Sequence, residues 1–161
     1  MKPEIILIAV TLIAMLTKKL REGTYAPTRA ARAGMAAMLI LTGTGHFLFT
    51  KGMAMMLPAF LPGKEVIVYL TGIAEFAAAV GLLTDRYRTA TAWAVIAFFV
   101  LITPANIYAA LHHVDLQKGT YGGPGPEYLW YRIPLQLFFI GWVYFSSLAG
   151  ETKRAIAGSL R

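Results

Sequence analysis

The sequence predicts an all-α protein, a transmembrane four-helix bundle with an additional N-terminal helix, which makes five spans. Of the 161 residues, 57% are apolar and 14% are charged, whereas ordinary soluble domains contain about 45–50% apolar and about 25% charged residues. The apolar residues form five long segments separated by polar connections. Lys and Arg are also distributed unevenly between alternate connections, as the positive-inside rule describes for membrane proteins.

Five apolar segments are the predicted helices, in the order Ile5–Leu16, Gly34–Thr50, Val66–Thr84, Thr89–Leu111 and Leu129–Gly150. The last four contain about 17–23 residues, enough to cross a hydrocarbon core of about 30 Å at about 1.5 Å per residue. The first is shorter, and Lys2 in front of it is also compatible with a signal peptide. Lys18 and Lys19 behind it, with no small-residue cleavage site directly after, favour a retained helix.

We therefore expect three regions: an N-terminal transmembrane helix in residues 1–20, a four-helix membrane domain in residues 29–150 and a cytoplasmic tail in residues 151–161. Two connections have recognisable chemistry. Lys51–Lys64 has an apolar core too short to span, which predicts an interfacial hairpin or re-entrant stretch broken at Pro58 and Pro62. Gln117–Glu127 contains four Gly and two Pro, which predicts a flexible outer connection.

The basic residues predict the orientation. With the N-terminus outside, ten Lys and Arg fall on the inner side and four on the outer side, so we expect a multi-pass protein of the plasma membrane with a cytoplasmic C-terminus. The net charge of +7 does not indicate a nucleic-acid partner, because the basic residues lie between apolar stretches rather than along one face. The absence of cysteine excludes disulfides, thiolate metal sites and a thiol nucleophile.

Five polar residues within the predicted spans are the candidate functional residues: His46, Glu75, Asn106, Arg132 and Gln136. An ionisable side chain at membrane depth costs about 2.5–3.5 kcal/mol on insertion scales, so it needs a partner or a function. The alternating helix directions place all five in the middle-to-outer half of the bilayer. Small residues one turn from His46 and Glu75 predict close approach of their helices.

Two interpretations of this polar layer stay open. Glu75 and Arg132 could form a structural ion pair, with the other three residues as hydrogen bonds between helices. We favour a ligand site, because buried ionisable residues in membranes are functional by default. Glu75 and His46 are then the candidate catalytic acid/base residues, and the other three are candidate cofactor-binding residues. We expect no metal site, since a haem on His46 or a metal between His112 and Asp115 has weaker support.

The order of several short motifs resembles the DoxX-like family of small integral membrane proteins. These motifs are Gly43-x-x-His46-Phe47, Leu57-Pro58 with Leu61-Pro62, Tyr69-x-x-Gly72-x-x-Glu75, Pro104-Ala105-Asn106, Arg132-x-Pro134-x-Gln136 and Trp142. The resemblance covers roughly residues 29–147, four helices, and leaves the first segment as an added helix. It implies a four-helix membrane bundle, with some relatives linked to a thiosulfate:quinone oxidoreductase subunit and others to oxidative-stress complexes.

The functional hypothesis is a redox-linked, quinone-interacting oxidoreductase subunit in the lipid bilayer, with a redox partner protein. Arg132 and Gln136 would donate hydrogen bonds to the quinone, while Glu75 and His46 would relay protons. One alternative is an isomerase or lyase that acts on a small hydrophobic substrate by Glu/His acid–base chemistry. Another is a non-catalytic assembly protein, in which the polar residues only hold the helices together.

Overall fold

The computed structural model describes residues 2–149, and these fold almost entirely into helices, so the all-α prediction is confirmed. The predicted tail in residues 151–161 lies outside the described residues. The helices are α1 (Pro3–Glu22), α2 (Pro27–Leu48), α3 (Thr50–Met55), α4 (Lys64–Leu83), α5 (Arg88–Leu101), α6 (Thr103–Leu111) and α7 (Leu129–Val143). A π-helical turn, η2 (Tyr144–Leu148), continues α7, and a 3₁₀ turn, η1 (Pro126–Tyr128), precedes it.

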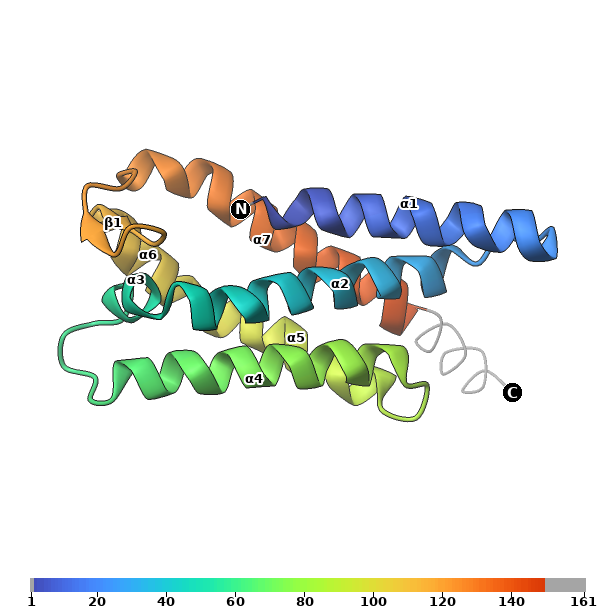
Figure 1. Ribbon diagram of the computed structural model, residues 1–161, viewed down its shortest axis with the longest axis horizontal. Helices are drawn as coiled ribbons and strands as arrows, with labels where there is room; N and C mark the ends of the chain where they lie inside the picture. The colour runs from blue at the N-terminus through green and yellow to red at the C-terminus, as the bar shows by residue number, and fades with distance from the viewer. Residues whose placement is uncertain (1, 150–161) are drawn as a thin grey trace, which may run out of the picture.

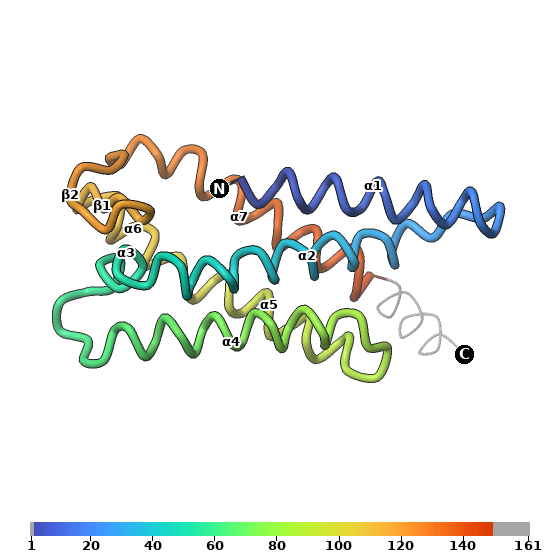
Figure 2. The backbone as a smooth tube through the Cα atoms, in the orientation of Figure 1, coloured from blue at the N-terminus to red at the C-terminus, as the bar shows by residue number. Residues whose placement is uncertain are grey.

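The long helices form an elongated bundle in which α2 lies between α1 and α4 (Figures 1 and 2). Successive long helices run in opposite directions along the axis, and α7 returns behind α2. Leu7 and Thr11 of α1 are buried, and a Cβ atom on Gly34 would lie 2.4 Å from the Leu7 carbonyl oxygen. The absence of a side chain at Gly34 therefore allows α1 to pack closely against α2.

The end of α1 and the start of α2 differ from the sequence prediction by about two turns. Helix α1 continues to Glu22 rather than Leu16, and Lys18 and Glu22 form an i,i+4 ion pair of 3.0 Å in its last turn. Gly23 then ends the helix with a φ of 68°, which glycine adopts without steric strain. Helix α2 begins at Pro27, seven residues before the predicted start at Gly34, because proline is favoured in a first helical turn.

The predicted single helix Thr89–Leu111 is two helices, α5 and α6, with a break at Ile102. Pro104 explains the break: it has no amide hydrogen to donate to the carbonyl of Val100 and its ring crowds the preceding turn.

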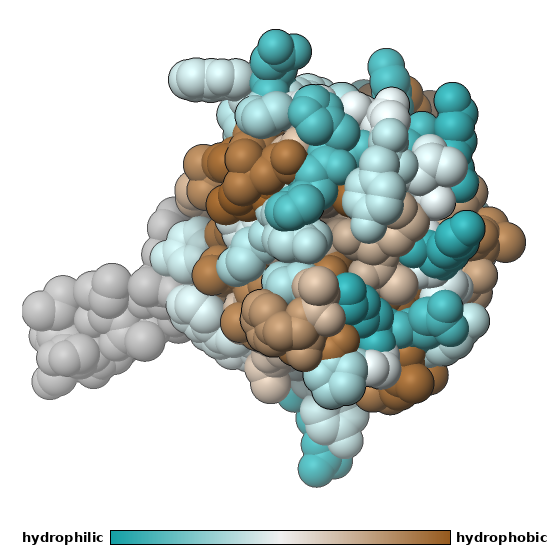
Figure 3. Space-filling model, turned by 90° about the vertical axis from the view of Figure 1, so that its left-hand side faces the viewer, coloured by the Kyte–Doolittle hydropathy of each residue, from teal (hydrophilic) through white to brown (hydrophobic). Residues whose placement is uncertain are grey.

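The two connections at the opposite end from Gly23 are ordered by local contacts. The first forms α3 and a turn, and Phe60 in that turn is 81% exposed. In the second, β1 (Val114–Asp115) pairs with β2 (Thr120–Tyr121), and Asp115 accepts two backbone hydrogen bonds of 3.0 Å within the turn. The predicted flexible loop is therefore in part a short hairpin. Figure 3 shows this end face on, with hydrophilic and hydrophobic residues interspersed.

Two stretches are long and apolar enough to cross a membrane by length and composition, Lys64–Leu83 and the combined α5–α6 stretch Arg88–Leu111. Only 28% of each hydrophobic window is buried within the bundle. None of the other helices within residues 2–149 meets the same criterion; α7, for example, has 15 residues before its π-helical turn.

The bundle has a close-packed half and a hollow half. The buried apolar core lies towards the end where α2 begins and α4 ends, and includes Leu7, Met35, Leu39, Leu82 and Val143. The remaining halves of these helices surround a cavity beneath α3 and the hairpin. The polar residues predicted from the sequence lie in this second half.

Candidate functional site

A cavity of about 460 Å³ lies between α2, α4, α5–α6 and α7, and α3 and the hairpin also contribute to its wall. Its wall contains all five residues predicted from the sequence: His46, Glu75, Asn106, Arg132 and Gln136. The rest of the wall is largely apolar, with phenylalanine and methionine side chains from four helices. A mostly apolar cavity of this size with a few convergent polar groups is typical of a small-molecule site.

Two glycines bring α2 and α4 into contact at the cavity. A Cβ atom on Gly72 would lie 2.8 Å from the Cβ of His46 and 3.2 Å from the carbonyl oxygen of Gly43. A Cβ atom on Gly43 would lie 2.9 Å from the ring of Phe76. The predicted close approach of these helices is therefore present, and it places His46 of α2 beside Glu75 of α4.

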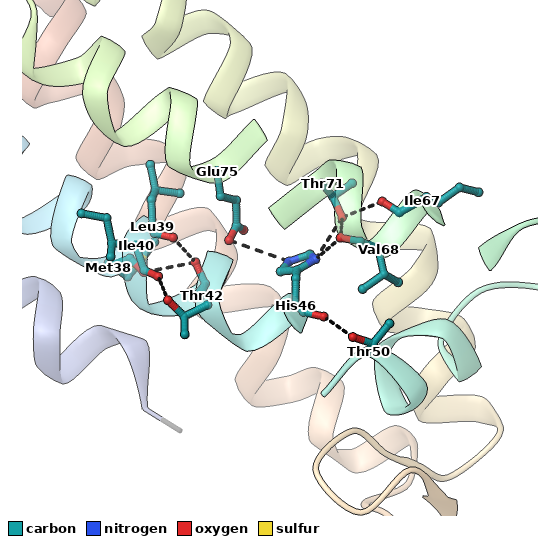
Figure 4. A network of polar contacts seen from close by, with 11 residues as sticks. Met38, Leu39, Ile40, Thr42, His46, Thr50, Ile67, Val68, Thr71 and Glu75 are labelled. Carbon is teal, nitrogen blue, oxygen red and sulfur yellow. Dashed lines mark hydrogen bonds and ion pairs between the residues drawn. The ribbon is translucent and has the colours of Figure 1, made fainter. Parts of the chain in front are cut away.

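The imidazole of His46 is held in a defined orientation by α4 (Figure 4). Its Nδ1 lies 2.9 Å from the carbonyl oxygen of Val68 and 3.0 Å from the hydroxyl of Thr71. A carbonyl oxygen only accepts hydrogen bonds, so Nδ1 carries the proton and donates it to Val68. Nε2, on the far side of the ring, is then the nitrogen that gains or loses a proton.

Glu75 approaches that nitrogen from one turn further along α4. Its Oε2 lies 3.7 Å from Nε2 of His46, within ion-pair range but beyond hydrogen-bond length. The side chain of Glu75 is 7% exposed, and Oε2 has no hydrogen-bond partner among residues 2–149. A buried carboxylate oxygen without a partner is costly in an apolar environment. Glu75 therefore presents an unused hydrogen-bonding position at the cavity wall.

Asn106 and Gln136 form a second polar group, which joins the α5–α6 break to α7. The Gln136 amide nitrogen donates to the carbonyl of Phe99 and, at 2.7 Å, to the hydroxyl of Thr103. Its amide oxygen accepts a hydrogen bond of 3.3 Å from Asn106. Backbone groups freed by a helix break in an apolar environment need such partners. Both donors of Gln136 are thus engaged within the bundle, so of these two residues Asn106 has the greater remaining capacity to contact a ligand.

Arg132 lies one turn before Gln136 on α7, and its residue is half-buried at the cavity wall. The structural interpretation expected it to pair with Glu75, but within the described part of the chain Arg132 has no ion pair within 4 Å, and Glu75 pairs with His46 instead. Two residues at a similar level along the bundle face one another only if the rotation of each helix about its own axis directs both side chains to the same side. Arg132 is therefore a cation at the cavity wall without a carboxylate within 4 Å in the described part of the chain.

Two features of the site were not predicted from the sequence. The hairpin contributes Val114, Asp115 and Leu116 to the cavity wall, which no periodic pattern indicates. Glu4 of α1 accepts a hydrogen bond of 2.8 Å from Tyr131, beside the Arg132 position. The only sequence feature that points to Glu4 is an ionisable residue directly before the first apolar segment. Its partner Tyr131 is 127 residues away, so the contact could not be predicted.

The arrangement places a fixed imidazole in ion-pair range of a buried carboxylate, next to an apolar volume, so that either group can hold a proton at the cavity wall. Within residues 2–149, no group of three or more His, Cys, Asp or Glu side chains is placed to bind a metal ion.

A family model described as a domain of unknown function, DUF8561, matches residues 35–147. The matched segment runs from α2 to η2 and includes all five candidate residues. A search of curated proteins and a search of solved structures each gave no match.

Proposed function

The chain belongs to the DUF8561 family, and because its description states no function, we propose one from the cavity: an integral membrane protein that binds a quinone-like hydrophobic molecule. In this proposal it is a redox-linked subunit that exchanges electrons with a partner protein. The kinship with DoxX-like proteins stays a prediction.

Apolar exposure supports the membrane part of the proposal. In both stretches that meet the span criterion only 28% of the hydrophobic window is buried within the bundle, whereas the core helix of a soluble protein is mostly buried. Large apolar side chains are also exposed on the remaining long helices, for example Leu12 at 59%, Ile40 at 50% and Leu137 at 63%. Many large apolar side chains exposed on several helices indicate a lipid or protein environment. We propose five spans in the plasma membrane, with the N-terminus outside and the C-terminus in the cytoplasm.

The single observation that carries the ligand proposal is Oε2 of Glu75, which is buried at the wall of an apolar cavity and has no hydrogen-bond partner among residues 2–149. A purely structural Glu75 would be expected to have its oxygens satisfied by neighbouring helices. A ligand with a hydrogen-bonding oxygen and an apolar body satisfies both the carboxyl group and the cavity. Quinones have this chemistry, and when bound they supply two carbonyl oxygens and the capacity to take up two electrons and two protons.

The residues of this chain would act on the ligand in three ways. The protonated Glu75–His46 pair would donate a hydrogen bond to one oxygen and hold the proton needed there. Arg132, which has no ion pair within 4 Å among residues 2–149, would donate to the second oxygen or stabilise negative charge on the ligand. Gln136 would orient the Asn106 side chain towards the ligand, because it accepts a hydrogen bond from the Asn106 amide and is itself bound to the α5–α6 break.

The same pair supports a second candidate, an isomerase or lyase for a small hydrophobic substrate. The specific observation is the orientation of His46, whose Nδ1 is fixed by Val68 so that Nε2 is available as an acid or base. This candidate requires no electron acceptor, which separates it from the first.

The test is quinone binding by the protein in nanodiscs, measured by quenching of tryptophan fluorescence with a short-chain ubiquinone and with a short-chain menaquinone. We expect saturable binding, and a loss of about tenfold or more in affinity for Glu75→Gln, corresponding to about 1.4 kcal/mol for a charge-assisted hydrogen bond. Glu65→Gln is the matched control, because Glu65 is an exposed carboxylate in the first turn of the same helix.

Absence of saturable binding by both quinones would refute the quinone proposal. Turnover of a hydrophobic substrate without an electron acceptor, lost in Glu75→Gln, would then favour the second candidate. If joint replacement of Glu75 and Arg132 by leucine preserved the cellular function of the protein, the polar residues would be structural and both proposals would be wrong.

A further inference from the structure

The cavity extends out of the bundle at the first turn of α1. Four helical segments surround it, α2, α4, α5–α6 and α7, and α1 packs outside this ring, along α2. Pro3 of α1 is nevertheless part of the cavity wall. A cavity inside the ring reaches an outer helix only by extending between two of the helices that surround it. Because α1 packs on α2 and its start contacts α7, the cavity extends between α2 and α7.

One hydrogen bond crosses this gap. The hydroxyl of Tyr131 in α7 donates to Oε1 of Glu4 in the first turn of α1, at 2.8 Å. Figures 1 and 2 show the start of α1 beside α7 at this point. The next residue of α7, Arg132, is in the cavity wall. The hydrogen bond therefore lies at the edge of the cavity and connects the two sides of the gap.

Little else holds the first turn of α1 in place. The buried side chains of α1 are Leu7 and Thr11, and residues 3–6 in front of them have none. A terminal helical turn without buried side chains opens at a low cost in free energy. Oε2 of Glu4 is shielded from solvent and has no hydrogen-bond partner among residues 2–149. Hydration of this oxygen would favour an open position, so the bond from Tyr131 opposes an opening that is otherwise inexpensive.

The side chains around the gap indicate where a ligand comes from. Tyr128, Trp130 and Tyr131 lie at the start of α7, and Trp130 is 85% exposed. Aromatic residues grouped in this way are typical of a membrane–water interface. Further along the two helices, Ile5 of α1 and Leu137 of α7 are exposed apolar residues. The gap therefore opens between an interfacial level and an apolar surface, which suits a molecule with an oxygen-bearing head and an apolar tail.

We propose that the gap between α2 and α7 is the entrance to the cavity for a ligand dissolved in the bilayer, and that the first turn of α1 is its gate. The gate consists of residues 3–6 and the hydrogen bond from Tyr131 to Glu4. When the gate opens, the ligand head passes Arg132 into the cavity, while its tail stays in the lipid. This inference rests on the membrane insertion and the cavity of the proposed function, but not on the ligand being a quinone.

The test uses the absence of cysteine from the chain. Thr42, a half-buried residue of α2 in the cavity wall, is replaced in Thr42→Cys, and the rate of its modification is measured in nanodiscs. Two reagents of the same chemistry are compared. Benzyl methanethiosulfonate dissolves in lipid, whereas a trimethylammonium methanethiosulfonate stays in water. We expect the benzyl reagent to react faster, because the entrance faces the bilayer.

Addition of Tyr131→Phe to this background should raise the benzyl rate about two- to twelvefold, which corresponds to the loss of a hydrogen bond of about 0.5–1.5 kcal/mol. Glu4→Ala should have the same effect. The double variant should be no faster than either single variant, because both changes remove the same bond. Glu22→Gln is the matched control, since it breaks the ion pair with Lys18 at the other end of the same helix.

An unchanged rate in Tyr131→Phe, or equal acceleration in Glu22→Gln, would overturn the proposal. Additive effects of the two gate variants would also overturn it, because the two side chains would then act separately. Faster modification by the charged reagent would show that the cavity is entered from water instead. The rates are measured without quinone, so the expected pattern in a protein that binds no quinone would support the gate and refute only the ligand of the proposed function.

Discussion

The crossing of α2 and α4 has no room for an additional methyl group, and Gly72→Ala tests how far the candidate site depends on this contact. The new Cβ would lie 2.8 Å from the Cβ of His46, whereas ordinary contacts of this kind begin near 3.4 Å. The atom it meets is the base of a side chain, which cannot rotate away. The two helices must therefore separate locally by about 0.6 Å (3.4 minus 2.8).

The expected cost follows from two opposing effects. Overpacking of a close contact destabilises by about 1–3 kcal/mol, while replacing glycine by alanine inside a helix recovers about 0.5–1 kcal/mol. We expect a net loss of about 1–2 kcal/mol in unfolding free energy. The separation also lengthens the contact of His46 with Glu75 beyond its present 3.7 Å. Quinone affinity should therefore fall several-fold.

The assay is thermal unfolding in detergent, followed by the quinone titration in nanodiscs, for the wild type and two variants. Gly141→Ala is the matched control, because a Cβ atom at Gly141 in α7 meets no heavy atom within 4 Å. This control should be as stable as the wild type or more stable. If Gly72→Ala matched Gly141→Ala in both stability and affinity, the close crossing would not position His46, and the reasoning would be wrong.

Three further predictions concern the contacts that enclose the cavity. Gln136→Leu removes three hydrogen bonds between helices. Because such a bond contributes about 0.6 kcal/mol in membranes, the free energy of unfolding should fall by about 2 kcal/mol. An unchanged midpoint of thermal unfolding would contradict this. Gly52→Ala places a Cβ too close to the carbonyl oxygen of Leu116, which displaces the hairpin from α3. The rate of amide hydrogen exchange in the hairpin should therefore rise. An unaltered rate would show that contact with α3 does not stabilise the hairpin. Tyr131→Phe removes the donor to Glu4 and should cost about 0.5–1.5 kcal/mol, with faster exchange confined to the start of α1.

Much of the candidate site could be predicted from individual residues. Glu75 and His46 are costly in an apolar segment, and their depth follows from residue count along a helix, so their position in one layer was predictable. The choice of partner was not predictable. Glu75 faces His46 rather than Arg132, because the glycines at positions 43 and 72 set the distance and rotation of α2 against α4.

The amino-acid sequence by itself determined the helical class, the order and direction of the long helices, and which polar side chains share a level. These properties depend on composition and on a constant rise per residue, both of which are local. Only the tertiary structure decided the break between α5 and α6 with its engaged Gln136, the hairpin over the cavity and the ion pairs of Asp85 with arginines of α2 and α5. Each of these depends on side chains that are distant in sequence, whose contacts are fixed only when the helices pack against one another.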